Sequence, residues 1–228
     1  MFVGHYALGL AAKRAAPGAS LGTLFAAPAL ADLLWPVFLL AGWEHVTIAP
    51  NPNPFLTLVF DAYPLSHSLL TLAAWGVLGA FVYRWRTGYG RGAVVVALLV
   101  VSHWVLDVVV HRPDLPLYPG GPRFGLGLWN SVGGTLLVEG LMLIAGAATY
   151  FTTTRARDAA GRYGLGALLL LIVASYISTL FAGPPPSVRT LAIGAIVFGW
   201  LVVGGAAWAD WHRDAVARFD AAPGASTA

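Results

Sequence analysis

The chain has 228 residues, of which 58% are hydrophobic and only 10% are charged, whereas soluble domains have roughly 25% charged residues. This composition predicts an integral membrane protein. The chain contains no cysteine, which excludes disulfides and thiolate metal sites, so any metal must be bound by His, Asp or Glu. The net charge of +3 is small and the basic residues are scattered in short connections, so we expect no nucleic-acid partner.

The first part of the chain predicts a short helix, a span and an irregular connection. Residues Met1–Ala16 are apolar but short for a bilayer crossing, and we expect a partly inserted helix with His5 near its start. Ser20–Gly42 has the length of a span and contains Asp32, while two prolines indicate a kink. Repeated X-Pro steps exclude a regular helix from the connection Trp43–Ser66, apart from a short amphipathic turn.

The middle of the chain predicts two further helices. A span from Pro64 to about Arg84 has Ser66 as a candidate N-cap, which puts His67 in its first turn. After a basic turn comes the apolar helix Gly92–His111. The following loop, Arg112–Asn130, is so rich in proline and glycine that we expect no regular element in it.

The last part of the chain predicts spans at Ser131–Phe151, Gly164–Phe181 and Arg189–Ala209, then a disordered tail at 221–228. The expected fold is therefore all-α, a polytopic transmembrane helical bundle of about six spans plus the short N-terminal helix. We expect a single domain over residues 1–220. Because the final two spans carry few polar side chains, we interpret them as scaffold or as the contact of a homo-oligomer.

One face of the helix Gly92–His111 carries three ionisable side chains. His103, Asp107 and His111 follow one another at intervals of four residues, so they form a narrow stripe with steps of about 6 Å. Each would cost roughly 2.5 to 3.5 kcal/mol within a bilayer, which indicates a function. The first two can share one metal ion. His111 either binds a second ion bridged by Asp107, or serves as a second-layer or substrate-binding group.

The positions of the basic residues predict the orientation in the membrane. Lys13, Arg14 and the turns at 84–91 and 155–162 should be cytoplasmic. We therefore expect a multi-pass protein of the inner (plasma) membrane with a cytoplasmic C-terminus. This orientation brings six candidate metal ligands to similar depths near the extracytoplasmic face. They are His5, Asp32, His67, His103, Asp107 and His111.

The order of these residues resembles a known family. An N-terminal His5, an Asp within the proline-rich stretch Pro28–Pro36, a Ser-His-Ser-Leu-Leu stretch (Ser66–Leu70) and a Ser-His-x-x-x-Asp helix (Ser102–Asp107) resemble the bacterial integral-membrane metal-dependent hydrolases. The ligand order is more distantly similar to zinc-dependent phospholipase C and the P1-type nucleases. The resemblance implies a multinuclear zinc site that cleaves phosphate esters. The implied ligands are Asp32, His67, His103 and Asp107, followed by His5 and His111.

Three residues outside the ligand set are candidates for other roles. Glu139 lies in the middle of a span, where it could be a further ligand, a hydrogen-bond acceptor for a ligand histidine, or the general base. With His111 it is our candidate catalytic group. Arg112 and Arg123, in the outer loop, are candidates for binding a phosphate, although they could also hold lipid head groups.

The first functional hypothesis is a membrane hydrolase that uses a metal-activated water on an ester, above all a phosphoester, of a membrane lipid. The metal would be Zn²⁺, as one or two ions, with Mn²⁺ as the alternative. The second hypothesis is a non-enzymatic protein that transfers protons or metal ions through its His and Asp residues. It is opposed by the apolar sequence of residues 93–101, which offers no polar continuation. A structural subunit of a larger complex is a third possibility.

Overall fold

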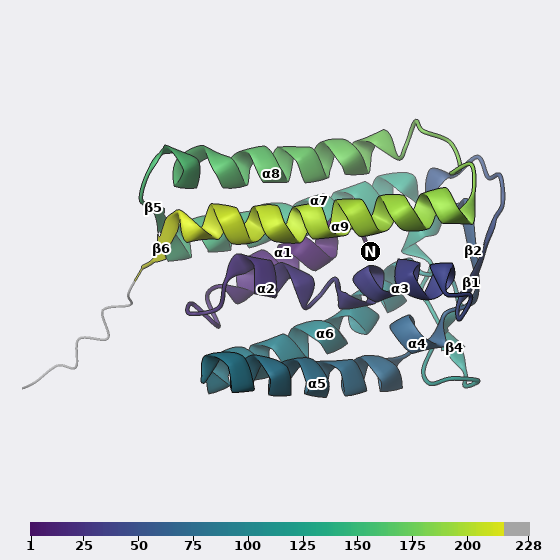
Figure 1. Cartoon of the computed structure of the whole chain (residues 1–228). Coiled ribbons are helices and arrows are strands. Elements are labelled where there is room, and N and C mark those ends of the chain that lie inside the picture. The colour runs from purple at the N-terminus through teal and green to yellow at the C-terminus, as the bar shows by residue number, and fades with distance from the viewer. Residues whose placement is uncertain (217–228) are drawn as a thin grey trace, which may run out of the picture.

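The computed structural model describes residues 1–216, and its helices form a bundle with short strands gathered at both ends (Figure 1). The helices are α1 (Val3–Ala12), α2 (Leu21–Ala26), α3 (Leu30–Leu40), α4 (Pro64–His67), α5 (Leu69–Thr87), α6 (Gly90–Val110), α7 (Val132–Thr153), α8 (Ala159–Ser178) and α9 (Val188–Trp211). The expected all-α fold class is confirmed. The predicted tail at 221–228 lies outside the described residues.

Four helices, α6 to α9, are long and apolar enough to cross a membrane. The 21 residues of α6 extend over about 31 Å, close to the roughly 30 Å hydrocarbon core of a bilayer. Large apolar side chains such as Leu98, Ile144 and Leu170 are exposed on the outside of the bundle. The protein is therefore a membrane protein. Six spans were expected, but α5, with Arg84 and Arg86 in its last turn, is not among the four helices.

The predicted kinked span Ser20–Gly42 is instead two helices, α2 and α3, with residues 27–29 between them. The proline in this break has no N–H group to donate within a helix. Its carbonyl oxygen is used elsewhere: it lies 2.7 Å from Nδ1 of His103 on α6. The break in the helix thus provides a hydrogen-bond acceptor for a candidate metal ligand.

Both long connections contain regular structure that the sequence did not predict. The first connection contains an antiparallel hairpin and the second contains a shorter one, while a third ribbon closes the opposite end of the bundle. The pairs are β1 (His45–Ile48) with β2 (Leu58–Ala62), β3 (Leu115–Pro116) with β4 (Arg123–Phe124), and β5 (Thr154–Ala156) with β6 (Arg213–Ala215). Single 3₁₀ turns, η1 (Pro54–Leu56) and η2 (Leu128–Asn130), lie in the same two connections. The proline-rich run forms the loop of the first hairpin.

Helix α1 lies in the middle of the bundle, where it packs against α7, α2 and α6 (Figure 1). The close approach of α1 to α7 depends on Gly146, because a Cβ atom there would lie 2.3 Å from the carbonyl oxygen of Ala7. This oxygen belongs to the backbone and cannot rotate away. The position of α1, and with it that of His5, is thus determined by a glycine on the neighbouring helix.

We expect the Gly146→Ala variant to be destabilised by about 1 to 3 kcal/mol, as is typical of an overpacked interior. Gly140→Ala is the matched control on the same helix, because a Cβ at position 140 has no neighbouring atom within 4 Å. Thermal unfolding in detergent should show a lower midpoint for the first variant only. Equal midpoints for the two variants would contradict the proposed packing of α1.

Candidate metal centre

Asp107 is the central residue of the site, and two histidines of the same stripe point towards it. Nε2 of His103 lies 3.0 Å, and Nε2 of His111 3.5 Å, from Oδ2 of Asp107. The two histidines are about 12 Å apart along the helix axis. Their side chains nevertheless meet at one carboxylate oxygen, because Asp107 stands between them and both rings are directed towards it. Either arrangement predicted for His111 remains compatible with these distances.

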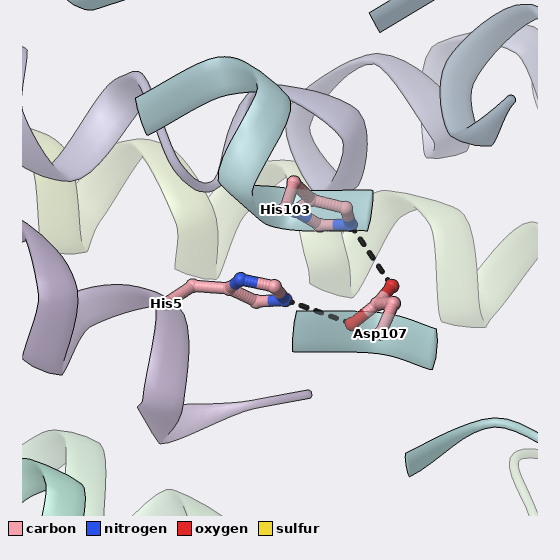
Figure 2. A group of neighbouring side chains, drawn as sticks. All are labelled: His5, His103 and Asp107. Atoms are coloured by element: carbon pink, nitrogen blue, oxygen red, sulfur yellow. Dashed lines mark hydrogen bonds and ion pairs between the residues drawn. The ribbon is translucent and has the colours of Figure 1, made fainter. Parts of the chain in front are cut away.

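Three further ligand candidates come from other helices. Nε2 of His5, on α1, lies 3.1 Å from Oδ1 of Asp107, so His5 and His103 approach different oxygens of this carboxylate (Figure 2). The rings of His5 and His103 are stacked with centroids 4.0 Å apart. Asp32 of α3 and His67 of α4 also belong to the cluster, with 3.6 Å between Oδ1 and Nε2. His67 Nε2 is 4.0 Å from Asp107 Oδ2.

The structure therefore gathers all six predicted ligands in one cluster, with the Asp107 carboxylate at its centre. Two subsets have ligand atoms within 4.8 Å of one another, as binding of a single ion requires; they are His5, His103 and Asp107, and Asp32, His67 and His103. His103 belongs to both subsets. A buried group of His and Asp that could hold a metal ion is thus a feature of the described chain.

The site is buried on most sides and opens into a cavity of about 260 Å³. His103 is completely buried and Asp107 is 2% exposed, whereas Asp32 is 48% exposed. The exposed part of the Asp32 side chain lines the cavity, together with His67 and His111. A ligand in the cavity would therefore contact the site from the side of Asp32.

Hydrogen bonds fix the ring orientation of His67 and His103. The hydroxyl of Ser66 donates to Oε2 of Glu44 at 2.6 Å, so it can only accept at the 2.7 Å contact with Nδ1 of His67. Nδ1 of His103 likewise faces a carbonyl oxygen, which has no proton to donate. In both rings Nδ1 therefore carries the proton, and in the neutral ring Nε2 bears the lone pair.

His111 has the same arrangement through an acidic partner. Its Nδ1 lies 2.9 Å from Oδ1 of Asp114, which also accepts a 2.9 Å hydrogen bond from the hydroxyl of Tyr63. Burial and the neighbouring Asp114 raise the pKa of the Tyr63 hydroxyl, which keeps it protonated as a donor. In metal sites, a ligand histidine commonly donates the N–H of its second ring nitrogen to a carboxylate. The contact between His111 and Asp114 has this form.

These orientations direct the Nε2 atoms of three histidines towards carboxylates, so in a neutral ring the Nε2 lone pair faces an electron-rich oxygen. Two such groups repel each other unless a cation lies between them or the rings are protonated. Within residues 1–216, Nε2 of His103 has no hydrogen-bond partner, although Oδ2 of Asp107 is only 3.0 Å away. An orphaned buried nitrogen beside a carboxylate fits the donor set of a metal ion.

Glu139 has a different environment from the six ligands. Its Oε2 accepts hydrogen bonds from the backbone N–H groups of Phe2, at 2.8 Å, and Gly4, at 3.1 Å. Glu139 thus holds the beginning of α1, and it is not among the residues that line the cavity. The N-terminal amino group of Met1 forms an ion pair with Oδ1 of Asp107. Its predicted role as a base remains a prediction, whereas its contacts position the helix that carries His5.

The two arginines predicted to bind an anion lie outside the cavity. Arg112 and Arg123 are both exposed, and neither is among the residues that line the cavity at Asp107. Arg123 donates from Nη2 to the carbonyl oxygen of Asp61 at 3.0 Å, which joins β4 to the end of β2. In this structure, Arg123 therefore connects the hairpins β1–β2 and β3–β4.

Sequence reasoning missed several residues that support the ligands. Asp114 follows His111 by three residues, a spacing that could have been recognised. Glu44 is 1% exposed and lies 22 positions before its partner Ser66, so no local pattern indicates the contact. Trp35 lines the cavity with a buried Nε1 that has no partner among the described residues.

Comparisons of the chain with protein-family models, with characterised proteins and with solved structures found no match. The resemblance to membrane metal-dependent hydrolases therefore remains a prediction from the motifs.

Proposed function

We propose that the protein is a membrane-embedded, metal-dependent hydrolase that cleaves an ester, best a phosphoester, of a lipid-like substrate. The observation that carries this proposal is the convergence of histidine Nε2 atoms on Asp107 at the wall of a cavity. A site of imidazoles and carboxylates without thiolates suits Zn²⁺, with Mn²⁺ as the alternative.

The proposed ligands divide into a core and a flank. His103 and Asp107 form the core, to which His5 adds a nitrogen on the buried side, while Asp32 and His67 complete the side facing the cavity. His111 binds a second ion or orients the substrate. When bound, the metal would polarise the ester and lower the pKa of a coordinated water.

The residues of the cavity have further tasks in this proposal. The Asp32 carboxylate faces the cavity and can accept a proton from the attacking water. The indole N–H of Trp35, which has no partner within residues 1–216, can donate a hydrogen bond to a substrate oxygen. Glu139 positions His5 through the start of α1. We therefore assign the proton transfer to Asp32 in preference to Glu139.

The proposed location is the plasma membrane, with the site on the extracytoplasmic side and a lipid substrate from the outer leaflet. The basic residues at the end of α5 and beside β5 lie at one end of the bundle, while the hairpins β1–β2 and β3–β4 lie at the other (Figure 1). A cytoplasmic basic end agrees with the positive-inside rule. Self-association through α8 and α9 stays a proposal as well.

Transfer of protons or metal ions is the alternative function. It requires polar groups along a path through the membrane. Residues 93–101 of α6, between the site and the opposite end of the helix, are all alanine, valine or leucine. This apolar stretch favours the hydrolase.

The direct test is hydrolysis by the purified protein in detergent, with added Zn²⁺ or Mn²⁺. Phospholipids and polyprenyl phosphates are suitable substrates, and released product is measured with and without EDTA. We expect turnover that EDTA removes and fresh metal restores. A protein that binds metal but cleaves none of these esters would favour metal-ion transfer.

We expect the Ser66→Ala variant to bind the metal about 10- to 100-fold more weakly, because loss of a hydrogen bond to a ligand histidine has effects of this size. The substitution removes the acceptor that keeps the proton on Nδ1 of His67. Ser68→Ala is the matched control: its hydroxyl caps α5 through the N–H of Thr71, so it should lower stability but not affinity. Metal titration by calorimetry distinguishes the two, and equal affinities would contradict the proposed role of Ser66.

A further inference from the structure

A second cavity, of about 450 Å³, adjoins the cavity of the metal centre. The two share part of their walls, so they lie side by side. The shared residues are Phe2, Leu58, Phe60, Trp129 and Leu191. The volume of the second cavity lies within the range of about 300 to 1,000 Å³ that is typical of small-molecule sites.

The two compartments differ in chemistry. The first contains two carboxylates and two of the candidate histidines. The second is lined by aromatic rings, prolines and small side chains, and none of its lining residues within the described part of the chain carries a charge. It extends from the shared wall past Phe55 and Thr179 to the prolines at 184–186, in the turn between α8 and α9. A polar end and an apolar end are thus arranged side by side.

We propose that the second compartment binds the apolar chain of the substrate while its ester lies at Asp32 and Asp107. The substrate is then an amphiphile with one long apolar chain beside the cleaved bond. This inference rests on the proposed function only in placing the ester of the substrate at the metal centre. The occupant is a substrate chain because the same five residues line the compartment and the cavity of the metal centre, which places an apolar chain next to the ester.

This compartment would discriminate between substrates by the length of their apolar chain. Transfer of a methylene group from water to an apolar site improves affinity by about fourfold. Water-soluble alkyl phosphates should therefore bind more tightly as the chain lengthens, until the compartment is full. The lack of charge on its walls predicts that a charged group at the far end of the chain abolishes this gain.

A photo-crosslinking experiment tests the proposal without requiring turnover. The probe is dodecyl phosphate with a diazirine near the end of its chain, and labelled peptides are identified by mass spectrometry. We expect labels at Phe55 and at 179–186, and competition by decyl phosphate but not by butyl phosphate. Labels spread over the outward faces of α6 to α9 would instead show nonspecific lipid contact and overturn the proposal.

Two tryptophan substitutions provide the matched pair. Thr179 lines the compartment and Ser178 does not, although each hydroxyl donates to the carbonyl three residues earlier. We expect Thr179→Trp to reduce the labelling at least tenfold and Ser178→Trp to leave it unchanged. Equal labelling of the two variants with equal thermal stability would contradict the inference.

The same probe separates this inference from the proposed function. In the Asp107→Asn variant the chain compartment is unaltered, so the label should persist while hydrolysis is lost. Specific labelling of a protein that hydrolyses no ester would refute the hydrolase but keep the chain site. Hydrolysis without specific labelling, and without a chain-length preference, would refute the chain site but keep the hydrolase.

Discussion

Replacement of Asp107 by asparagine should abolish metal binding and reduce hydrolysis by more than about 100-fold, since loss of even an outer partner of a ligand costs 10- to 100-fold. The amide retains the shape of the side chain but removes the negative charge on which the histidines converge. His5, His103 and His111 would then face a neutral group. The measurement is the initial rate of ester hydrolysis at saturating metal, together with the metal content.

Asp61→Asn is the control for this variant. Asp61 lies on β2, at the same end of the bundle, and is exposed, with its carboxylate accepting a hydrogen bond from Thr47. We expect unchanged metal content and activity. Full activity of Asp107→Asn, or equal losses in the two variants, would contradict the central place of Asp107.

The second large effect concerns the opposite end of the bundle. Asp210 of α9 forms a 2.7 Å ion pair with Lys13, and both side chains are more than nine-tenths buried. The same carboxylate accepts hydrogen bonds from the hydroxyl of Tyr150 and from the backbone N–H of Leu21. The cluster thereby connects α1, α2, α7 and α9.

We expect Asp210→Ala to destabilise the protein by about 3 to 5 kcal/mol, because it leaves the Lys13 ammonium buried without its partner. Asp214→Ala is the control, since the Asp214 carboxylate is 67% exposed and its 3.7 Å pair with Arg157 should contribute little. Thermal unfolding in detergent should show a much lower midpoint only for the first variant. A midpoint equal to that of the control would contradict the structural role of the cluster.

The sequence predicted much of the site because its signals are local or follow from topology. The spacing of His103, Asp107 and His111 places them on one helical face, and the alternation of spans brings His5 and His67 to the same end. The membrane class follows from composition alone. The structure agrees with these expectations in placing the other five side chains around Asp107.

Other features depend on contacts that no sequence period encodes. The acceptor for His103 is a carbonyl oxygen in the break between α2 and α3, and the Glu44–Ser66–His67 chain joins the residue before β1 to α4. The prolines that indicated a kink did not show that the helix would separate into two. The hairpins were missed because prolines and glycines, which are typical of loops, are frequent in their turns, and Pro116 even lies within β3.

The most direct measurement is the metal content of the purified, detergent-solubilised protein by elemental analysis, with Asp107→Ala and Glu139→Ala measured alongside. We expect zinc or manganese near one or two ions per chain in the wild type and none in Asp107→Ala. Glu139→Ala should retain metal, because this glutamate contacts the backbone of α1. A wild-type protein without bound metal, even after reconstitution with Zn²⁺ and Mn²⁺, would contradict the metal centre and with it the proposed hydrolase.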